Sequence, residues 1–447
     1  MNCFWVKINE TAGENPIIRV PSIIFTHLEH LSLIQHGLLK KNGTVKAKLT
    51  DNSQKGTQEN PFIIDVSASL VNDLYLLKDI PYRLTTRGDT IKFGPVTGIM
   101  IRSQEELNLR EEVYPHLGGI LVSPSQFDWE KGIVTGEVYD SSKSRWVLKT
   151  VPLPEVIFNR SLMKKKKKVK LITKYQALGG VFYNSNRYNK AEVENAVLQR
   201  SELQKYVIKS RTVLDKKDVF SALSAHKKIV LKPVRSVQGN GIMFIKRKKR
   251  NEYLVYYYRK NKSDTEVYSV ISRKKLAELL DTINFKRKPH LVQPWIRFLT
   301  YNKSPFDLRV HMHKDDRSWM CAGIECRVAQ KGEKITNISK GGSVLSLSEA
   351  LSSSSGVRRR ALEEEVVDVC LKICTTLETN YPSECFADLG IDIAIDKRKK
   401  LHFIEVNFHP QFKGFQKISE EIYRKINCQP LIHATKLQGF KVDKKAS

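Results

Sequence analysis

Three oxygen-bearing side chains recur at regular spacing near residue 400. Asp392 alternates with isoleucines in residues 390–395, and Glu405 and Asn407 alternate with apolar residues in 401–407. Both stretches have the period of a half-buried strand. Folded as an antiparallel hairpin about the basic turn between them, they bring Asp392 to about 5 Å from Glu405. Two carboxylates and an amide oxygen on neighbouring strands suit a Mg²⁺ ion that is shared with nucleotide phosphates. From these residues alone, a hairpin whose polar side chains face solvent is an equally good interpretation.

Upstream, residues 228–246 predict a strand, a glycine-bearing loop and a second strand. Gly239 and Gly241 let backbone N–H groups approach phosphate oxygens, and Lys232 supplies a fixed positive charge. The alternative is an ordinary β-hairpin turn, and the P-loop pattern is absent. Residues 290–296 predict a strand that runs into a proline, where the backbone could face a flat heterocycle or form an ordinary sheet edge.

The two strands that follow residue 303 alternate apolar and polar side chains. Arg309 and Arg327 lie on the polar faces and could bind phosphate or another anion bidentately. Exposed strands with surface ion pairs are the favoured alternative. His311 and His313 share the face of Arg309. They could be metal ligands, but a histidine pair without further His or Cys is more often polar surface.

These elements fall into three predicted domains. Short alternating strands with polar turns indicate a β-rich domain at 1–92, and strands with mixed connections indicate an α/β unit at 93–180. Residues 181–447 predict helices around an antiparallel sheet, with an exposed connection at the lysine run after Met163. The helix candidates are Ala191–Tyr206, Lys216–His226, Arg273–Ile283, Arg360–Thr379 and Lys417–Ile426.

Composition limits the class of protein. A chain of 447 residues with 41% hydrophobic content is globular, and its apolar stretches are too short to cross a bilayer. Seven cysteines and no signal peptide predict a cytoplasmic protein in a reducing compartment; Cys370 and Cys374 are expected in the core. The net charge of +29 attracts polyanions, but the lysine clusters lack interleaved aromatics, so we expect no specific nucleic-acid partner and no membrane partner.

Taken in order, several short motifs resemble the ATP-grasp superfamily of carboxylate–amine ligases, and most closely its YheC/YheD-type, endospore-coat-associated branch. The resemblance covers about 181–415. The motifs that carry it are Lys232-Pro with Gly239-x-Gly-Ile242, Pro305-Phe-Asp-Leu-Arg-Val310 with Arg327-Val-Ala329, Thr336-Asn337 with Gly341-Gly342, Leu389-Gly-Ile-Asp392 and Ile404-Glu-Val-Asn407.

The resemblance implies an α+β ATP-grasp fold of two lobes, preceded by a Rossmann-like pre-ATP-grasp α/β domain and the small N-terminal β domain. It implies ATP and Mg²⁺ as cofactors. Separately, the glycine-rich loop at Asn337 and Gly341-Gly342 could close over the site or be an ordinary connection. The implied metal ligands are Asp392, Glu405 and Asn407. The implied nucleotide-binding residues are Lys190, Lys232, Gly239, Gly241, Gln293, Trp295 and Ile296, and the implied catalytic residues are Arg309, Arg327 and Asn337.

The expected function is an ATP-dependent ligase that activates a small-molecule or peptide carboxylate as an acyl phosphate for attack by an amine. The resemblance also implies a role in sporulation and an association with the spore coat. Three features depart from the family pattern: Ser236-Val237 replaces a usual Gly-Ser, Asp388 replaces a common glutamate, and Asn407-Phe-His-Pro410 continues into an unusual tail, Gln411-Phe-Lys-Gly414. The altered glycine loop and the high positive charge leave open an alternative, a structural spore-coat protein that retains the fold without turnover. A third possibility is nonspecific nucleic-acid binding through the lysine clusters.

Overall fold

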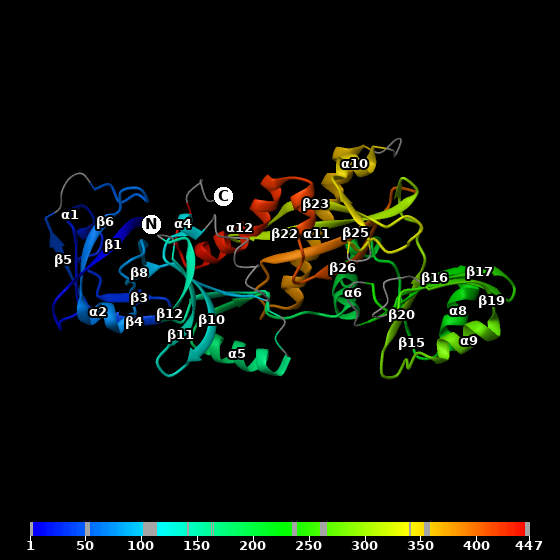
Figure 1. Cartoon of the computed structure of the whole chain (residues 1–447), viewed down its shortest axis with the longest axis horizontal. Coiled ribbons are helices and arrows are strands. Elements are labelled where there is room, and N and C mark those ends of the chain that lie inside the picture. Colours follow the sequence, from blue (N-terminus) through cyan, green and yellow to red (C-terminus); the bar gives the residue numbers. More distant parts are fainter. Residues whose placement is uncertain are drawn as a thin grey trace.

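Four sheets follow one another along the long axis of the computed structural model (Figure 1). The structure describes all residues except 1–2, 50–53, 102–113, 141–142, 162, 164, 235–238, 260–265, 339–340, 353–357 and 443–447. Helix and strand are mixed throughout the chain, as the predicted α+β class requires. Among the described helices, none combines the length and apolar character needed to traverse a lipid bilayer.

The first sheet is built from residues 3–94 and has strand order β4-β3-β8-β7-β1-β6-β2-β5. Alternating apolar residues on its strands form one core with two short helices. The elements are β1 (Cys3–Thr11), β2 (Ile17–Pro21), α1 (Ser22–Phe25), β3 (Leu33–His36), β4 (Leu39–Asn42), β5 (Thr44–Lys48), β6 (Phe62–Ser67), α2 (Ala68–Asp73), β7 (Tyr82–Arg87) and β8 (Thr90–Gly94).

The second sheet has order β12-β11-β10-β9-β13-β14, with parallel pairing from β10 to β14. Its elements are β9 (Val96–Met100), α4 (Tyr114–Leu117), β10 (Ile120–Asp128), β11 (Ile133–Asp140), β12 (Arg145–Pro152), β13 (Val156–Asn159), α5 (Lys165–Ala177) and β14 (Val181–Tyr183). The lysine run that was expected to be a connection lies in α5, so that prediction is wrong. Lysines are good helix formers, and the apolar side of α5 packs on the sheet.

The third sheet is antiparallel, with order β15-β20-β16-β17-β18-β19, and α8 and α9 cover one face. Ile229 and Leu231 of β16 point into the helix-covered core, so Val230 and Lys232 face the opposite side. Its elements are β15 (Arg211–Val213), α8 (Lys216–His226), β16 (Lys228–Pro233), β17 (Met243–Lys249), β18 (Glu252–Tyr257), β19 (Glu266–Ser272), α9 (Arg273–Asp281) and β20 (His290–Pro294).

The fourth sheet, of order β24-β23-β22-β25-β26, stands between the second and third (Figure 1). Its strands are β21 (Thr300–Tyr301), which pairs with β22, then β22 (Ser304–Asp315), β23 (Ser318–Val328), β24 (Ser343–Leu345), β25 (Asp388–Ile395) and β26 (Leu401–Asn407). Its helices are α6 (Lys190–Leu198), α7 (Ser201–Gln204), α10 (Leu347–Leu351), α11 (Arg359–Asn380), η2 (Lys413–Lys417) and α12 (Glu420–Leu437).

Both faces of this sheet are covered. On one face α6 and α11 bury Phe306, Leu308 and Val310, and Cys370 and Cys374 lie in that core as predicted. On the other face η2 and α12 pack over part of β22 and β23. Because α12 and η2 cover this face, His311 and His313 are fully buried. The prediction that they lie on a polar surface is therefore wrong.

Helix α12 also joins the sheets. It contacts β9 and β13 of the second sheet, and its apolar residues share a core with Ile99 and Phe158. Just beyond the helix, Gln438 accepts a hydrogen bond from the Val96 amide at 2.8 Å and donates one to Thr97 at 2.9 Å. The domain division at 92 and 180 stays a prediction, since β14 and α12 link the second and fourth sheets.

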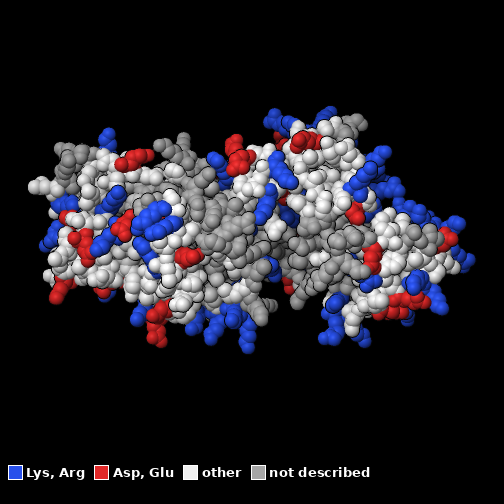
Figure 2. Space-filling model, in the orientation of Figure 1, with Lys and Arg blue, Asp and Glu red and all other residues white. Residues whose placement is uncertain are grey.

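Lysine and arginine gather at several places on the face drawn in Figure 2, two of which lie over identifiable elements. One lies over the end of the molecule formed by the third sheet, and the other lies along α5. Both follow the lysine clusters seen in the sequence, and acidic side chains are interspersed at the first. On this face the two groups lie over different sheets and are separate from each other.

Candidate active site

The hairpin of β25 and β26 brings the three expected metal ligands together. Asp392 pairs with Glu405 and Gly390 pairs with Asn407, so the three polar side chains share one face. The Asn407 amide donates to Asp392 Oδ2 at 3.3 Å. A β-bulge after Asp392 shifts the register of the remaining pairs, and it leaves these three residues on the same side.

Two arginines neutralise the Asp392 carboxylate. Arg309 donates from Nε and Nη2 to both Asp392 oxygens at 2.8 and 2.9 Å. Arg327 lies 2.9 Å from Asp392 and binds Asp307 through two hydrogen bonds of 2.8 Å. Burial would raise the pKa of Asp392, but Arg309 and Arg327 outweigh burial and lower it to about 2. The expectation of exposed strands with surface ion pairs is therefore wrong here, because Asp307, Arg327 and Asp392 are all buried.

Two lysines approach the hairpin from other elements. Lys190 begins α6, where Asn189 and Glu192 form a capping box, and its ammonium lies 2.7 Å from Glu405 Oε2. Lys232 of β16 is only 7% exposed. Burial, and then the nearby charge of Lys190, lower its pKa to about 8. Two converging ammonium groups, one of them buried, favour binding of an anion between them.

The donor set fits a magnesium ion shared with phosphate. Asp392, Glu405 and Asn407 offer oxygens of the type that Mg²⁺ prefers. Glu405 is the most accessible of the charged groups, with 25% of its side chain exposed, whereas the Asp392 side chain is 3% exposed. Because Lys190 contacts Glu405 directly, a cation at Glu405 competes with that ammonium.

The glycine-bearing loop after β16 lies against the loop after β23. Gly239 and Gly241 have φ of +73° and +81°, which glycine adopts without strain. A Cβ at Gly239 would lie 2.7 Å from the Ile335 side chain. The departure at Ser236-Val237 lies outside the described residues, so the loop is characterised from Gly239 onward.

The end of β20 forms an aromatic wall. Gln293 pairs with Val230 of β16, and the half-buried Trp295 ring lies edge-on to Phe244 at 5.1 Å. The Trp295 amide donates to the Lys228 carbonyl at 3.0 Å, so this peptide group is already used within the sheet. The Trp295 N–H is therefore not available to a nucleotide base, whereas its ring and the backbone of Gln293 and Ile296 stay candidates for base binding.

The loop that carries Asn337 is anchored at several points. Thr336 donates to Asp307 at 2.7 Å, and a Cβ at Gly342 would lie 3.0 Å from the Asn337 carbonyl. The Tyr258 hydroxyl, at the end of the third sheet, donates to Glu333 at 2.6 Å. The loop therefore bridges the third and fourth sheets beside Arg327, and its expected closure over the site stays a prediction.

Asp307 and Glu325 were not identified from the sequence as site residues. Asp307 holds Arg327 in place, and Glu325 lies opposite Arg309 in the sheet register. Burial, only partly offset by Arg309 and Arg327, raises the pKa of Glu325 to about 7. The alternation of side chains along β22 and β23 could have identified them, because both residues fall on the same face of these strands as the two arginines.

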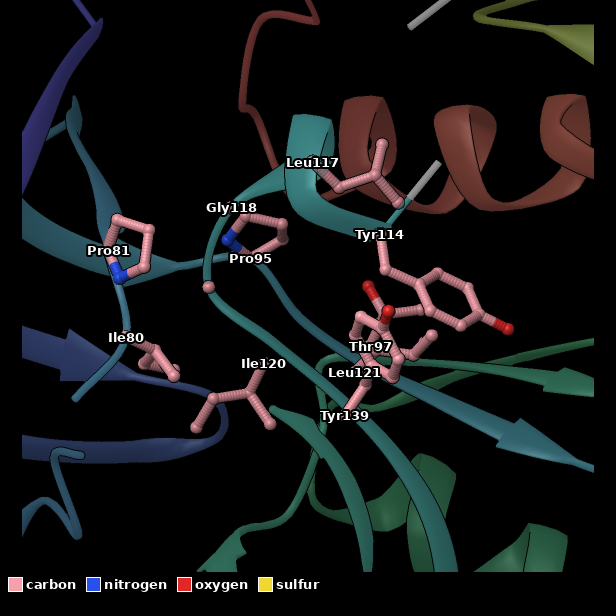
Figure 3. Close-up of a pocket in the computed structure, with 11 residues that line it drawn as sticks. Ile80, Pro81, Pro95, Thr97, Tyr114, Leu117, Gly118, Ile120, Leu121 and Tyr139 are labelled. Carbon is pink, nitrogen blue, oxygen red and sulfur yellow. The ribbon is translucent and has the colours of Figure 1, made fainter. Parts of the chain in front are cut away.

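A small cavity lies far from these residues, between the first and second sheets (Figure 3). Ile80 and Pro81 lie on one side of it, and Thr97, Leu121 and Tyr139 on the other. Its volume of about 20 Å³ has room for about one water molecule. It cannot accept a nucleotide, so it does not compete with the hairpin region as the candidate site.

Comparisons with known proteins agree with the sequence resemblance. A model of the family described as YheC/D-like ATP-grasp matches residues 179–437. The endospore coat-associated protein YheD of Bacillus subtilis is 24% identical over 302 residues, which are 64% of this chain and 62% of that protein. YheC of the same organism is 23% identical over 306 residues, 67% of this chain and 82% of that protein. The chain thus spans less than two thirds of YheD.

Two solved structures are also similar. The ATP-grasp ligase PsnB, complexed with a minimal precursor, has a TM-score of 0.44 and 14% identity, covering 77% of this chain and 99% of its own. The D-alanyl-alanine synthetase A of Vibrio cholerae has a TM-score of 0.43 and 12% identity, covering 76% and 98%.

Proposed function

Because the chain belongs to the YheC/YheD-like ATP-grasp family, we propose that it is an ATP-dependent ligase that activates a carboxylate. The substrate carboxylate attacks the γ-phosphorus of ATP and ADP leaves, giving an acyl phosphate. An amine then attacks the acyl carbon, phosphate leaves, and the amine gives up a proton. The products are an amide, ADP and phosphate.

The observation that carries this proposal is the position of Lys232. Its ammonium is buried, has no ion-pair partner within the described part of the chain, and lies beside Lys190 and Glu405. A phosphate group there would compensate both ammonium groups. Lys232 and Lys190 then bind the phosphates, and the backbone at Gly239 and Gly241 approaches them.

The remaining residues have complementary roles in the proposal. Mg²⁺ held by Asp392, Glu405 and Asn407 would neutralise charge on the phosphate oxygens. Arg309 and Arg327 stabilise negative charge that develops on the transferred phosphoryl group. Asn337 is assigned to the same region through its loop, and Gln293, Trp295 and Ile296 line the base pocket.

Calorimetric titration with ATP, with and without Mg²⁺, tests the first half of the proposal. We expect binding to require Mg²⁺ and to be lost in Glu405→Gln, with Glu364→Gln on exposed α11 as the control. Folded protein that gives no heat with MgATP contradicts nucleotide binding. Phosphate release with carboxylate and amine mixtures tests turnover: binding without release in every mixture favours the structural spore-coat role.

We further propose a cytoplasmic protein that acts in spore formation and associates with the coat. This rests on the two coat-associated relatives. Deletion of the gene in its own host should change the protein composition of isolated spore coats. Unchanged coats would contradict the sporulation role and leave the ligase proposal intact.

A further inference from the structure

A second polar cluster lies on the same strands as the candidate active site but deeper in the molecule. His311 and His313 of β22 and Asp388 of β25 are all buried, and their ligand-type atoms lie within 4.8 Å of one another. In the sheet register, His313 pairs with Asp388 and His311 pairs with Gly390. The cluster therefore occupies the first and second side-chain rows beyond the Arg309–Asp392 pair on this face of the sheet.

The polar atoms of this cluster lack partners. Within the described residues, neither ring nitrogen of His311 or His313 makes a hydrogen bond, and neither does Asp388 Oδ1. His313 Nε2 lies 3.4 Å from Asp388 Oδ1, but without hydrogen-bond geometry. Buried polar atoms in folded proteins are nearly always paired. An ion bound by one ring nitrogen of each histidine and by Asp388 Oδ1 would give a partner to three of these five atoms.

Neighbouring side chains close the cluster from solvent. His311 lies between Gly323 on one adjacent strand and Gly390 on the other. A Cβ at Gly323 would lie 2.9 Å from the Phe415 ring, and one at Gly390 would lie 2.7 Å from the Pro410 side chain. The Phe415 ring stands edge-on to His311 at 5.1 Å. The space above His311 is thus filled by apolar groups, which offer no hydrogen bonds.

The Asp388 carboxylate is already oriented by a second residue. Arg160, which follows β13, donates to Asp388 Oδ2 and to the Pro410 carbonyl, each at 3.1 Å. Only Oδ1 is left facing the histidines. A carboxylate held by one oxygen and presented by the other is a common arrangement for metal ligands.

We propose that His311, His313 and Asp388 bind a divalent transition-metal ion of the zinc class, separate from the magnesium of the nucleotide site. Two imidazole nitrogens and one carboxylate oxygen suit Zn²⁺ and its neighbours in the first transition series, whereas Mg²⁺ prefers oxygen ligands. Zinc bonds of about 2.1 Å allow two ligand atoms to be at most about 4.2 Å apart. Small side-chain rotations bring the three ligands within that range.

Such an ion would hold β22 and β25 together next to the active site. His311 is two residues from Arg309, and Asp388 is four residues from Asp392 on the partner strand. The ion therefore fixes the strand pair that carries these two site residues. Its role is positional, and it is independent of whether the chain turns over ATP.

Metal analysis of the purified full chain tests the proposal. The chain is dialysed against a chelator and reloaded with Zn²⁺ or Co²⁺. We expect about one ion per chain, and a Co²⁺ visible absorption spectrum typical of nitrogen and oxygen ligands. Folded wild-type protein that retains no Zn²⁺ and gives no Co²⁺ spectrum overturns the proposal without any variant.

Variants then locate the ion. His313→Gln and Asp388→Asn should lose the bound ion, whereas Glu405→Gln at the nucleotide site should retain it. His36→Gln is the matched control, because His36 is equally buried but lies in the first sheet, where it hydrogen-bonds to the Leu74 carbonyl. An ion that persists in both His313→Gln and Asp388→Asn, or is lost in Glu405→Gln, overturns the assignment.

Discussion

The Lys190 ammonium lies 2.7 Å from Glu405 Oε2, so a basic and an acidic residue of the candidate site contact each other directly. The capping box at Asn189 fixes the start of α6 and with it the origin of this lysine. In the proposed complex Lys190 binds phosphate and Glu405 binds magnesium. MgATP binding then exchanges this ion pair for two new ones.

Replacing Lys190 should separate metal binding from nucleotide binding. In Lys190→Met, Glu405 loses its competing cation, so Mn²⁺ measured by electron paramagnetic resonance should bind more tightly without nucleotide. ATP affinity should fall by about tenfold or more, because a charged phosphate contact is lost. Lys216→Met, which removes an exposed ion pair with Asp281, is the control. Weaker Mn²⁺ binding in Lys190→Met would contradict the exchange.

The buried positive charge of Lys232 should destabilise the protein without nucleotide, and the same charge should favour phosphate binding. Its pKa of about 8 lies below the ordinary 10.5, so the unfolded chain binds more protons between these values and stability rises with pH across that window. At pH 7 the penalty is complete, and Lys232→Met should stabilise the free protein by up to about 3 kcal/mol in urea unfolding. The same variant should bind ATP poorly.

The wild-type affinity for ATP should fall as pH rises above 8, since Lys232 loses its charge, and calorimetry at pH 7 and pH 9 measures this. Lys228→Met, on the same strand but half-buried, is the control and should keep the pH dependence. If Lys232→Met still loses ATP affinity as the pH rises, a group other than Lys232 causes the pH dependence.

Glu325 should give stability the opposite pH dependence. Its pKa of about 7 exceeds the ordinary 4.5, so the folded chain binds more protons between these values and stability falls as pH rises through them. Glu325→Gln should remove this slope and unfold at higher urea concentration than wild type at pH 8. The difference should approach about 3 kcal/mol and nearly vanish at pH 4.5. Equal slopes in the two proteins would show that Glu325 is not the titrating group.

Asp307 should contribute strongly to stability through Arg327. Asp307→Asn removes the charge from a buried bidentate pair, and breaking such a pair costs about 3–5 kcal/mol. We expect the lower end, because Arg327 keeps its contact with Asp392. Asp368→Asn, which removes an exposed pair with Lys372, should have little effect on stability because solvent screens that pair. Similar urea midpoints for both variants would refute the role given to Asp307.

Local patterns predicted the parts of the site that neighbouring strands build. The alternation around Asp392 and Glu405 predicted their pairing, and Lys216–His226 matches α8 at both ends. The predicted helix at 191–206 is instead two helices interrupted at Gln199 and Arg200. The predicted helix at 417–426 starts later and runs through Pro430 to Leu437, because packing outweighs the usual effect of proline.

Contacts between distant segments could not be read from local patterns. Alternation along β22 predicts one exposed face, but α12, about a hundred residues later, covers His311 and His313. Likewise Arg160 reaches Asp388 across 228 positions of the chain. Nothing in the spacing of nearby residues encodes either contact.

The double attachment of α12 limits how the protein can be dissected. A fragment covering only the family-matched residues 179–437 would leave Leu431 and Ile432 without the Ile99 and Phe158 that they pack against. It would also lack Gln438, whose side chain links this helix to Thr97. Such a fragment would expose apolar side chains that are buried in the full chain, and it would tend to self-associate. Ligand binding measured on it would therefore not represent the intact protein.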